Sequence, residues 1–148
     1  MNYRKANIND IDCLVELRKR QLIDEGCYSD TNIDDELERY FSAGITNNTL
    51  VVWLALEEDS IIGTAGVCYF QYPPSFTNPT GEIAYITNVY TRDEYRKQGV
   101  ATKLLGLVME EVKNEGCKFA RLHASEQGKG LYEKIGFADA QGFMSKKM

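Results

Sequence analysis

The stretch Arg96-Lys97-Gln98-Gly99-Val100-Ala101 decides the fold of this chain, because it joins a β-branched segment to an amphipathic helix. The preceding residues 83–90, Ile-Ala-Tyr-Ile-Thr-Asn-Val-Tyr, are rich in the β-branched and aromatic types that favour strands. After the glycine, apolar residues recur at helical spacing: Val100, Leu104, Leu105, Val108, Met109 and Val112. The sequence therefore predicts a strand, a tight turn and a helix that Gly99 opens.

The first turn of that helix is suited to bind an anion. Its N–H groups have no partner inside the helix, and they point outward at the positive end of the helix dipole. The small residues Gly99 and Ala101 let an anion approach the backbone, and Arg96 and Lys97 add positive charge beside it. This arrangement predicts a phosphate-binding loop. Taken alone, the six residues also fit an ordinary strand-to-helix turn with a basic, solvated rim.

Two motifs of this chain resemble those of one enzyme family. Residues 96–101 resemble the pyrophosphate-binding signature Arg/Gln-x-x-Gly-x-Gly/Ala of the GNAT superfamily of acetyl-CoA-dependent N-acetyltransferases. Downstream, Leu131-Tyr132-Glu133-Lys134-Ile135-Gly136-Phe137 resembles the family's Leu-Tyr-x-x-x-Gly-Phe segment, and a strand signal at residues 119–123 lies between the two. Two motifs in the family's order argue against a chance match, and the resemblance extends over the whole chain.

Length and composition indicate one soluble globular domain over residues 1–148. The chain is 43% hydrophobic and 26% charged, which is typical of a protein with a single core. No apolar run approaches membrane-spanning length and the N-terminus lacks an apolar signal region, so we expect no membrane association and a cytoplasmic location. The cysteines are scattered without a C-x-x-C pair and there is a single histidine, so we expect reduced thiols and no metal site.

Charge restricts the class of partner. The net charge is −5, with 22 acidic against 17 basic residues, which argues against nucleic acid. Acidic residues crowd the segment 24–38, which the resemblance places beside the acceptor site: Asp24, Glu25, Asp30, Asp34, Asp35, Glu36 and Glu38. Their field would suit a cationic amine, but the same residues also fit a solvated helix face.

The resemblance implies an α/β (α+β) fold, a mixed, splayed central sheet of about six strands flanked by four helices. The expected order is β-α-α-β-β-β-α-β-α-β. Besides the elements above, local patterns predict strands at 3–6, 50–57, 61–70, 118–123 and 137–144, and helices at about 9–25, 32–44 and 126–134. Asn7 or Asn9 would cap the first helix, and the prolines at 73, 74 and 79 predict a loop over 71–80.

In this family the fourth strand splays from the fifth, and the opening receives the pantetheine arm of acetyl-CoA. A bulge commonly produces such a splay, and Asn88 is our candidate for it; an exposed polar position is the alternative. The backbones of Val89 and Thr91 would then pair with the pantetheine amides. The full set of cofactor-binding residues implied by the resemblance is Val89, Thr91, Arg96, Lys97, Gln98, Gly99, Val100, Ala101, Thr102, Ser125, Lys129 and Tyr132.

The chemistry requires a neutral amine, polarisation of the thioester carbonyl and a proton for the departing thiolate. Where the family often has a carboxylate or histidine on the fourth strand, this chain has Tyr85 and Thr87, and neither is a good base. Glu82 would face the other side of a regular strand. We therefore expect a water relay through Tyr85, Thr87 or an acidic group elsewhere. The backbone N–H of Val89 would hold the carbonyl oxygen.

Tyr132 is the expected proton donor, because the tyrosine at this place in the family motif contacts the thioester sulfur. A phenol is still protonated at neutral pH and can donate; a buried structural tyrosine is the alternative. Ser125 would contact the cofactor, cap the following helix, or do both. Four aromatic residues could close over the acceptor by cation–π contact or simply pack: Tyr28, Tyr72, Phe76 and Tyr85.

The resemblance therefore implies direct transfer of an acetyl group from acetyl-CoA to a small-molecule or peptide amine in a ternary complex, without a metal. It also allows a homodimer. The competing interpretation is a catalytically silent acyl-CoA-binding or regulatory domain of the same fold. The intact Tyr132 argues against that interpretation, and the lack of an obvious base argues for it.

Overall fold

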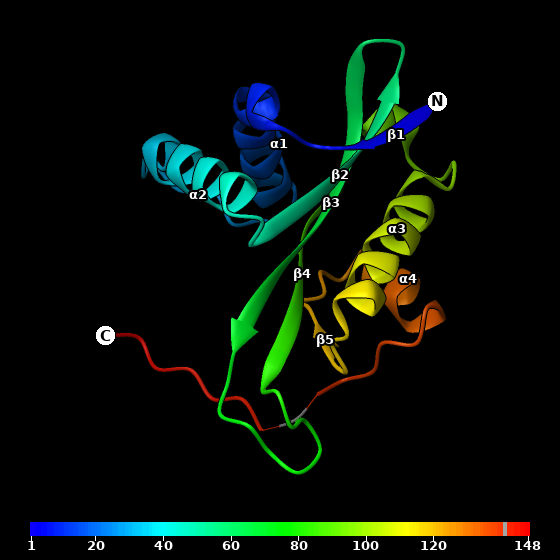
Figure 1. Cartoon of the computed structure of the whole chain (residues 1–148). Helices are drawn as coiled ribbons and strands as arrows, with labels where there is room; N and C mark the ends of the chain where they lie inside the picture. The colour runs from blue at the N-terminus through cyan, green and yellow to red at the C-terminus, as the bar shows by residue number, and fades with distance from the viewer. Residues whose placement is uncertain (141) are drawn as a thin grey trace.

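The computed structural model describes residues 1–140 and 142–148. Figure 1 shows an open sheet with helices packed against it. The strands are β1 (Asn2–Lys5), β2 (Leu50–Glu57), β3 (Ser60–Gln71), β4 (Glu82–Thr91) and β5 (Ala120–Arg121). The helices are α1 (Ile11–Asp24), α2 (Asp34–Thr46), α3 (Val100–Glu115) and α4 (Lys129–Lys134), with short 3-10 turns η1 (Ile8–Asp10) and η2 (Asp93–Tyr95).

The strands lie in the order β1-β2-β3-β4-β5. The first four pair antiparallel with their neighbours, and β5 runs parallel to β4. The mixed sheet and its open arrangement are those expected from the resemblance.

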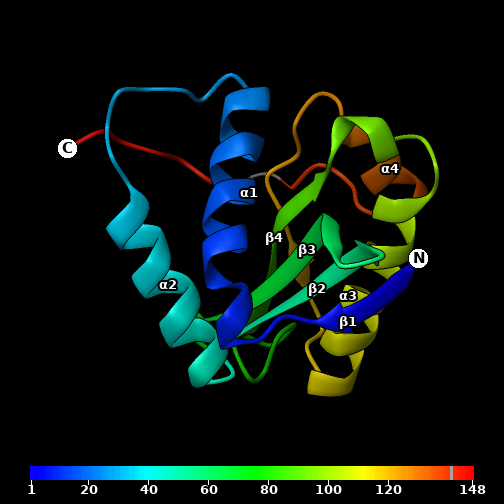
Figure 2. The same cartoon turned by 90° about the horizontal axis from the view of Figure 1, so that it is seen from above.

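Helices cover both faces of the sheet (Figure 2). On one face, α1 and α2 enclose a core around Phe41, Leu14 and Leu54. On the other face, α3 inserts its apolar stripe, including Leu104 and Leu105, against β2, β3 and β4. The periodic apolar positions that predicted α3 are therefore its buried side, and their burial fixes the helix, and with it the turn before it, against the sheet.

The start of α1 is fixed by polar contacts. Asn7 forms a capping box with Asp10 around η1, and the helix proper begins at Ile11. Asp10 also accepts two hydrogen bonds from Arg4, at 2.8 and 2.9 Å, and this partner lowers the pKa of the buried carboxyl. The prediction that Asn7 is a cap is thus confirmed for the 3-10 turn that leads into the helix.

A bulge interrupts β4 at Asn88. The residue has a φ of +55°, and the register between β3 and β4 shifts beside it, from Thr64 opposite Tyr90 to Gly66 opposite Thr87. The carbonyl of Asn88 accepts a hydrogen bond from the Thr64 hydroxyl at 2.7 Å, in place of a regular ladder bond. The bulge predicted at Asn88 is confirmed.

The C-terminal segment differs from the expected fold. A sixth strand is predicted over residues 137–144, but 137–140 and 142–144 form none; residue 141 lies outside the described part. Two features explain the difference. Gly142 has a φ of +101°, which breaks an extended run, and β5 spans only two residues and so has few backbone groups to pair with. The sheet therefore has five strands rather than about six.

Candidate active site

The edge of β4 beside β5 is largely unpaired because β5 is so short. The two strands pair only at Ala84 with Ala120 and Tyr85 with Arg121. In the part of the chain that the structure describes, no strand lies along this edge of β4 beyond Tyr85, a stretch that includes Thr87 and Val89. Their backbone groups are thus available to an extended ligand, as the sequence predicts for Val89.

The N-terminus of α3 follows β4 after a connection, residues 92–99, that contains η2. Gly99 adopts a φ of +81°, and no side chain caps the helix there. A Cβ built at Gly99 would meet nothing within 4 Å, so the space in front of the first helical turn is open. At Gly63 of β3, in contrast, a Cβ would lie 3.1 Å from Val100 Cγ1, so this glycine lets α3 approach the sheet. An uncapped helix terminus facing open space suits the predicted diphosphate.

The sequence predicts that Arg96 adds positive charge beside a bound phosphate, but in the structure it pairs with carboxylates of the protein. Its guanidinium lies 2.8 Å from carboxylate oxygens of Asp24 and Asp93, and its Nε donates to the carbonyl of Thr91 at 2.9 Å. The side chain therefore ties the loop to the end of α1, 72 residues away in sequence. Of the other predicted cofactor residues here, Lys97, Gln98 and Thr102 are exposed, Ala101 is half-buried, and Val100 is buried as the first residue of α3. Thr91 Oγ1 is buried and has no hydrogen-bond partner among the described residues.

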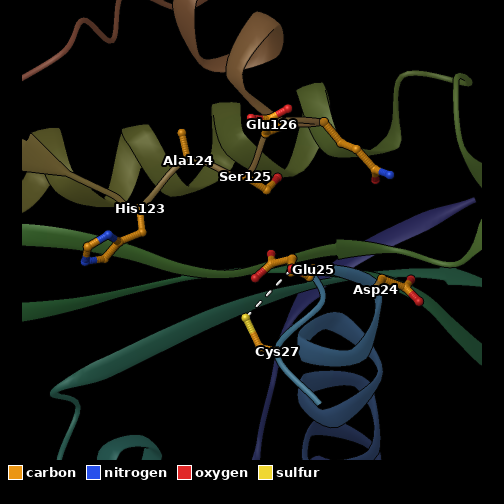
Figure 3. A pocket seen from close by; sticks show the side chains of 8 residues that line it. Asp24, Glu25, Cys27, His123, Ala124, Ser125 and Glu126 are labelled. Atoms are coloured by element: carbon orange, nitrogen blue, oxygen red, sulfur yellow. Dashed lines mark hydrogen bonds between the residues drawn. The ribbon is translucent and has the colours of Figure 1, made fainter.

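A cavity of about 460 Å³ lies between the end of α1 and the segment after β5 (Figure 3). One wall is formed by Asp24, Glu25 and Cys27, and the other by residues 123–127. Figure 3 shows the side chain of Glu25 opposite the segment that carries His123, Ala124, Ser125 and Glu126. His123 also packs against the ring of Tyr85, so the cavity adjoins β4.

Tyr132 lies on α4, next to this cavity wall. A Cβ at Gly128 would come within 2.8 Å of the Tyr132 ring and 3.2 Å of Ser125 Oγ, so these residues are in close contact. Burial, followed by the charge of Glu25, raises the pKa of Tyr132 to about 12. A phenol that stays protonated at neutral pH fits the predicted donor.

Ser125 caps the turn that leads into α4. Its hydroxyl accepts a hydrogen bond from the N–H of Gly128 at 3.1 Å. The N-cap of α4 is Gly128, which has no side-chain cap, so Ser125 stabilises the turn before the helix rather than capping the helix itself. Contact of Ser125 with the cofactor stays a prediction. Lys129 begins the helix and lies 3.8 Å from Asp139, with both side chains largely exposed.

The expected relay residues on β4 occupy different environments. Tyr85 packs edge-on against His123 at 6.0 Å, and burial raises the pKa of its phenol. Thr87 donates to the side-chain carbonyl of Asn88 at 2.8 Å. Glu82 accepts from the Cys117 thiol at 2.8 Å, which agrees with the expectation that it faces the other side of the sheet. Of the two relay candidates, Tyr85 and Thr87, Tyr85 is the one that contacts a residue of the cavity wall, His123.

The four aromatic candidates for the acceptor site do not gather in one place. Tyr28 lines a second hollow of about 470 Å³ beyond the end of α1. Tyr72 lies under the guanidinium of Arg121 at 5.7 Å, and Phe76 is fully exposed in the loop between β3 and β4. Of these four, Tyr85 contacts His123, which lines the first cavity. A role for the other three in acceptor binding stays a prediction.

Sequence reasoning did not single out Glu25 as a site residue. It appeared only as one member of an acidic run, because a pattern of charges does not show which of them faces a cavity. In the structure Gln21, one turn earlier on α1, donates to the Glu25 carboxylate at 3.2 Å. Among the described residues, no cluster of three or more metal-ligating side chains is present, and no helix is long and apolar enough to cross a membrane.

Comparisons with known proteins agree with this geometry. The model of the acetyltransferase (GNAT) family matches residues 14–137. The mouse thialysine N-epsilon-acetyltransferase is 31% identical over 94 residues, 60% of this chain and 53% of that protein. The pig enzyme of the same name is 32% identical over 89 residues, 56% of this chain and 52% of that protein. The chain thus spans about half the length of these thialysine N-epsilon-acetyltransferases.

Solved structures extend the likeness to the whole chain. A predicted acetyltransferase from Clostridium acetobutylicum, crystallised with acetyl-CoA, is 44% identical with a TM-score of 0.96, over 99% of this chain and 95% of that one. A GCN5-related N-acetyltransferase from Ralstonia eutropha shares the fold at 22% identity, with a TM-score of 0.89 over 99% of this chain and 97% of that one. These matches confirm the predicted fold and the predicted family. They confirm the enzyme class, N-acetyltransferases that use acetyl-CoA, as that of the family. Since the family model spans most of its length, this chain belongs to the acetyltransferase (GNAT) family.

Proposed function

We propose that residues 1–148 act as one domain that transfers an acetyl group from acetyl-CoA to an amine in a ternary complex. The observation that carries this proposal is the unpaired edge of β4 running into the uncapped N-terminus of α3. The first can pair with an extended arm and the second can hold a diphosphate. The Clostridium acetobutylicum protein, which was crystallised with acetyl-CoA, supports the choice of cosubstrate.

The transfer step assigns a task to each part of the site. The amine nitrogen attacks the thioester carbonyl carbon, a C–N bond forms, and the C–S bond breaks. The N–H of Val89 would hold the carbonyl oxygen as negative charge develops on it. Tyr132 would give its proton to the departing thiolate, and the proton that the amine loses would pass to Glu25 or through water beside Tyr85.

The names of the relatives narrow the acceptor. The mouse and pig proteins are named for N-epsilon acetylation of thialysine, an amine acceptor. We propose a small molecule with a primary amine as the acceptor here, because the cavity beside β4 is small and carries the exposed carboxylate of Glu25. A cation would be attracted to that carboxylate.

An acyl-transfer assay tests the proposal against the silent-domain alternative. Purified protein is incubated with acetyl-CoA and a panel of primary amines, and free CoA thiol and acetylated product are both measured. We expect amine-dependent product in amounts equal to the thiol released. Tight acetyl-CoA binding in a calorimetric titration, with no product from any amine, would favour the silent binding domain instead.

A further inference from the structure

Apolar packing holds the first part of α1 more firmly than its end. The buried apolar side chains of this helix are Ile11, Leu14 and Leu17. Closer to the end, Leu22 is half-buried and Ile23 is 49% exposed. Since burial of an apolar face is what normally fixes a helix against a sheet, the end of α1 depends more on polar contacts for its position.

Asp24, the last residue of α1, makes such a contact with Arg96 of the predicted phosphate-binding loop, residues 96–101. Its carboxylate accepts a hydrogen bond from Arg96 Nη2 at 2.8 Å, and the two side chains are 30% and 36% exposed. The same Nη2 lies 2.8 Å from Asp93, and Nε donates to the carbonyl of Thr91. These two partners belong to the segment that leads into the loop. Among the described residues, Asp24 is therefore the partner that joins Arg96 to a distant element.

The two ends of this ion pair lie in the two halves of the proposed site. Arg96 opens the loop that leads to the N-terminus of α3, where we place the diphosphate. Asp24 lines the cavity of Figure 3 with Glu25 and Cys27, and we call these three residues the acceptor wall. The N–H of Cys27 donates to the carbonyl of Leu22 at 2.8 Å, so the acceptor wall is continuous with the last turn of α1.

We propose that Asp24 is a positioning residue for acetyl transfer, which acts through Arg96 to fix the acceptor wall relative to bound acetyl-CoA. This inference rests on the proposed function. Transfer requires the amine nitrogen and the thioester carbon to be held about 3–3.5 Å apart. The wall that carries the amine must therefore be fixed relative to the loop that carries the cofactor, and the ion pair joins these two parts directly.

The ion pair contributes position rather than stability. A partly exposed ion pair adds little to the stability of a fold. Without the carboxylate of Asp24, the guanidinium of Arg96 still has Asp93 and the carbonyl of Thr91 as partners, so the loop keeps its local contacts. The relation between the loop and the end of α1 is what is lost. Its loss should slow transfer and leave the binding of CoA unchanged.

The test compares Asp24→Asn with Asp93→Asn, because both carboxylates lie 2.8 Å from the same nitrogen of Arg96. The acceptor is 1,5-diaminopentane, or whichever primary amine of the panel is acetylated faster. In Asp24→Asn we expect kcat/KM for the amine to fall by roughly 10- to 100-fold, as for a misplaced reacting group. The affinity for CoA in a calorimetric titration and the thermal unfolding midpoint should change little. Asp93→Asn should keep the wild-type kcat/KM, and Asp24→Glu should retain part of it.

A double variant separates positioning from direct contact, because the carboxylate of Asp24 also lines the cavity and could bind the amine itself. Arg96→Gln removes the ion pair and keeps a residue that fits the signature at this position. Alone, it should lower kcat/KM as much as Asp24→Asn does. Added to Arg96→Gln, Asp24→Asn should have no further effect, because the two changes then remove the same interaction.

Several results would overturn the positioning role while leaving acetyl transfer intact. These are wild-type kcat/KM in Asp24→Asn, a parallel loss of CoA affinity in that variant, an equal loss of kcat/KM in Asp93→Asn, or an undiminished effect of Asp24→Asn in the Arg96→Gln background. The last result would assign Asp24 to direct contact with the amine. If CoA binds and no amine is acetylated, the proposed function fails, and the positioning role fails with it.

Discussion

Tyr132 is the single side chain on which the proposed chemistry depends most. Its ring is buried against Phe137, with centroids 6.2 Å apart. Because the pKa of the phenol is raised to about 12, we expect its proton to be lost only at strongly alkaline pH.

Tyr132→Phe should therefore slow the chemical step and little else. The ring and its packing remain, so the KM for acetyl-CoA should change little, while kcat should fall by ~10²- to 10⁴-fold. Steady-state kinetics with the best acceptor provide the measurement. Tyr69→Phe is the matched control, because burial also raises the pKa of Tyr69 to about 12, but this residue lies near Glu111 and Glu115 on the α3 side. Nearly full kcat in Tyr132→Phe would make the hydroxyl structural.

The helix α3 has a glycine with the same left-handed backbone conformation at each of its two ends. Gly99 precedes its first turn and Gly116 follows its last, both with φ of +81° and both with no atom within 4 Å of a built Cβ. A β-branched residue at such a φ is strained wherever it is placed. The two glycines therefore differ mainly in position: Gly99 lies at the expected diphosphate site, and Gly116 lies at the opposite end of the helix.

We expect Gly99→Val to abolish CoA binding and Gly116→Val to leave the affinity unchanged. Both variants should lose stability by about 1–3 kcal/mol because both acquire the same backbone strain. Calorimetric titration with CoA and thermal unfolding separate the two effects. Unchanged CoA affinity in a folded Gly99→Val protein would remove the phosphate-loop assignment, and equal loss of affinity in both variants would attribute the effect to strain.

For the whole molecule, the structure divides the acidic run of 24–38 into paired and unpaired charges. Asp24, Asp34 and Glu36 form ion pairs with Arg96, Lys19 and Arg39. The net charge of −5 and the carboxylate of Glu25 beside the cavity remain to attract a cation. The run therefore has two roles: some of its members hold elements together, and at least one faces the candidate acceptor site.

Salt should accordingly weaken capture of a cationic acceptor. We expect kcat/KM for a diamine to fall as NaCl rises from about 0.05 to 0.5 M, because the screening length shortens over this range. Initial rates at fixed pH and saturating acetyl-CoA provide the measurement. The KM for acetyl-CoA, which is an anion, serves as the internal comparison. A flat response for the diamine would leave the negative charge with a role in solubility alone.

Local rules were sufficient to predict much of this fold. The strand, turn and helix around Gly99, the apolar face of α3 and the bulge at Asn88 each depend on residues within a few positions of one another. Backbone preferences and side-chain periodicity act over that range. The same rules failed for the strand expected at 137–144, because a strand also needs a neighbouring strand with free backbone groups, and β5 offers only two residues.

The sequence by itself therefore determined the family, the order of elements through α4 and the left-handed backbone of Gly99 before α3. Only the tertiary structure decided that Arg96 binds Asp24 rather than facing outward, and that Glu25 lines a cavity opposite His123 and Ser125. The physical reason is that these relations join α1 to groups more than sixty residues away. Such contacts follow from how helices pack on a twisted sheet, and no local pattern of residue types encodes them.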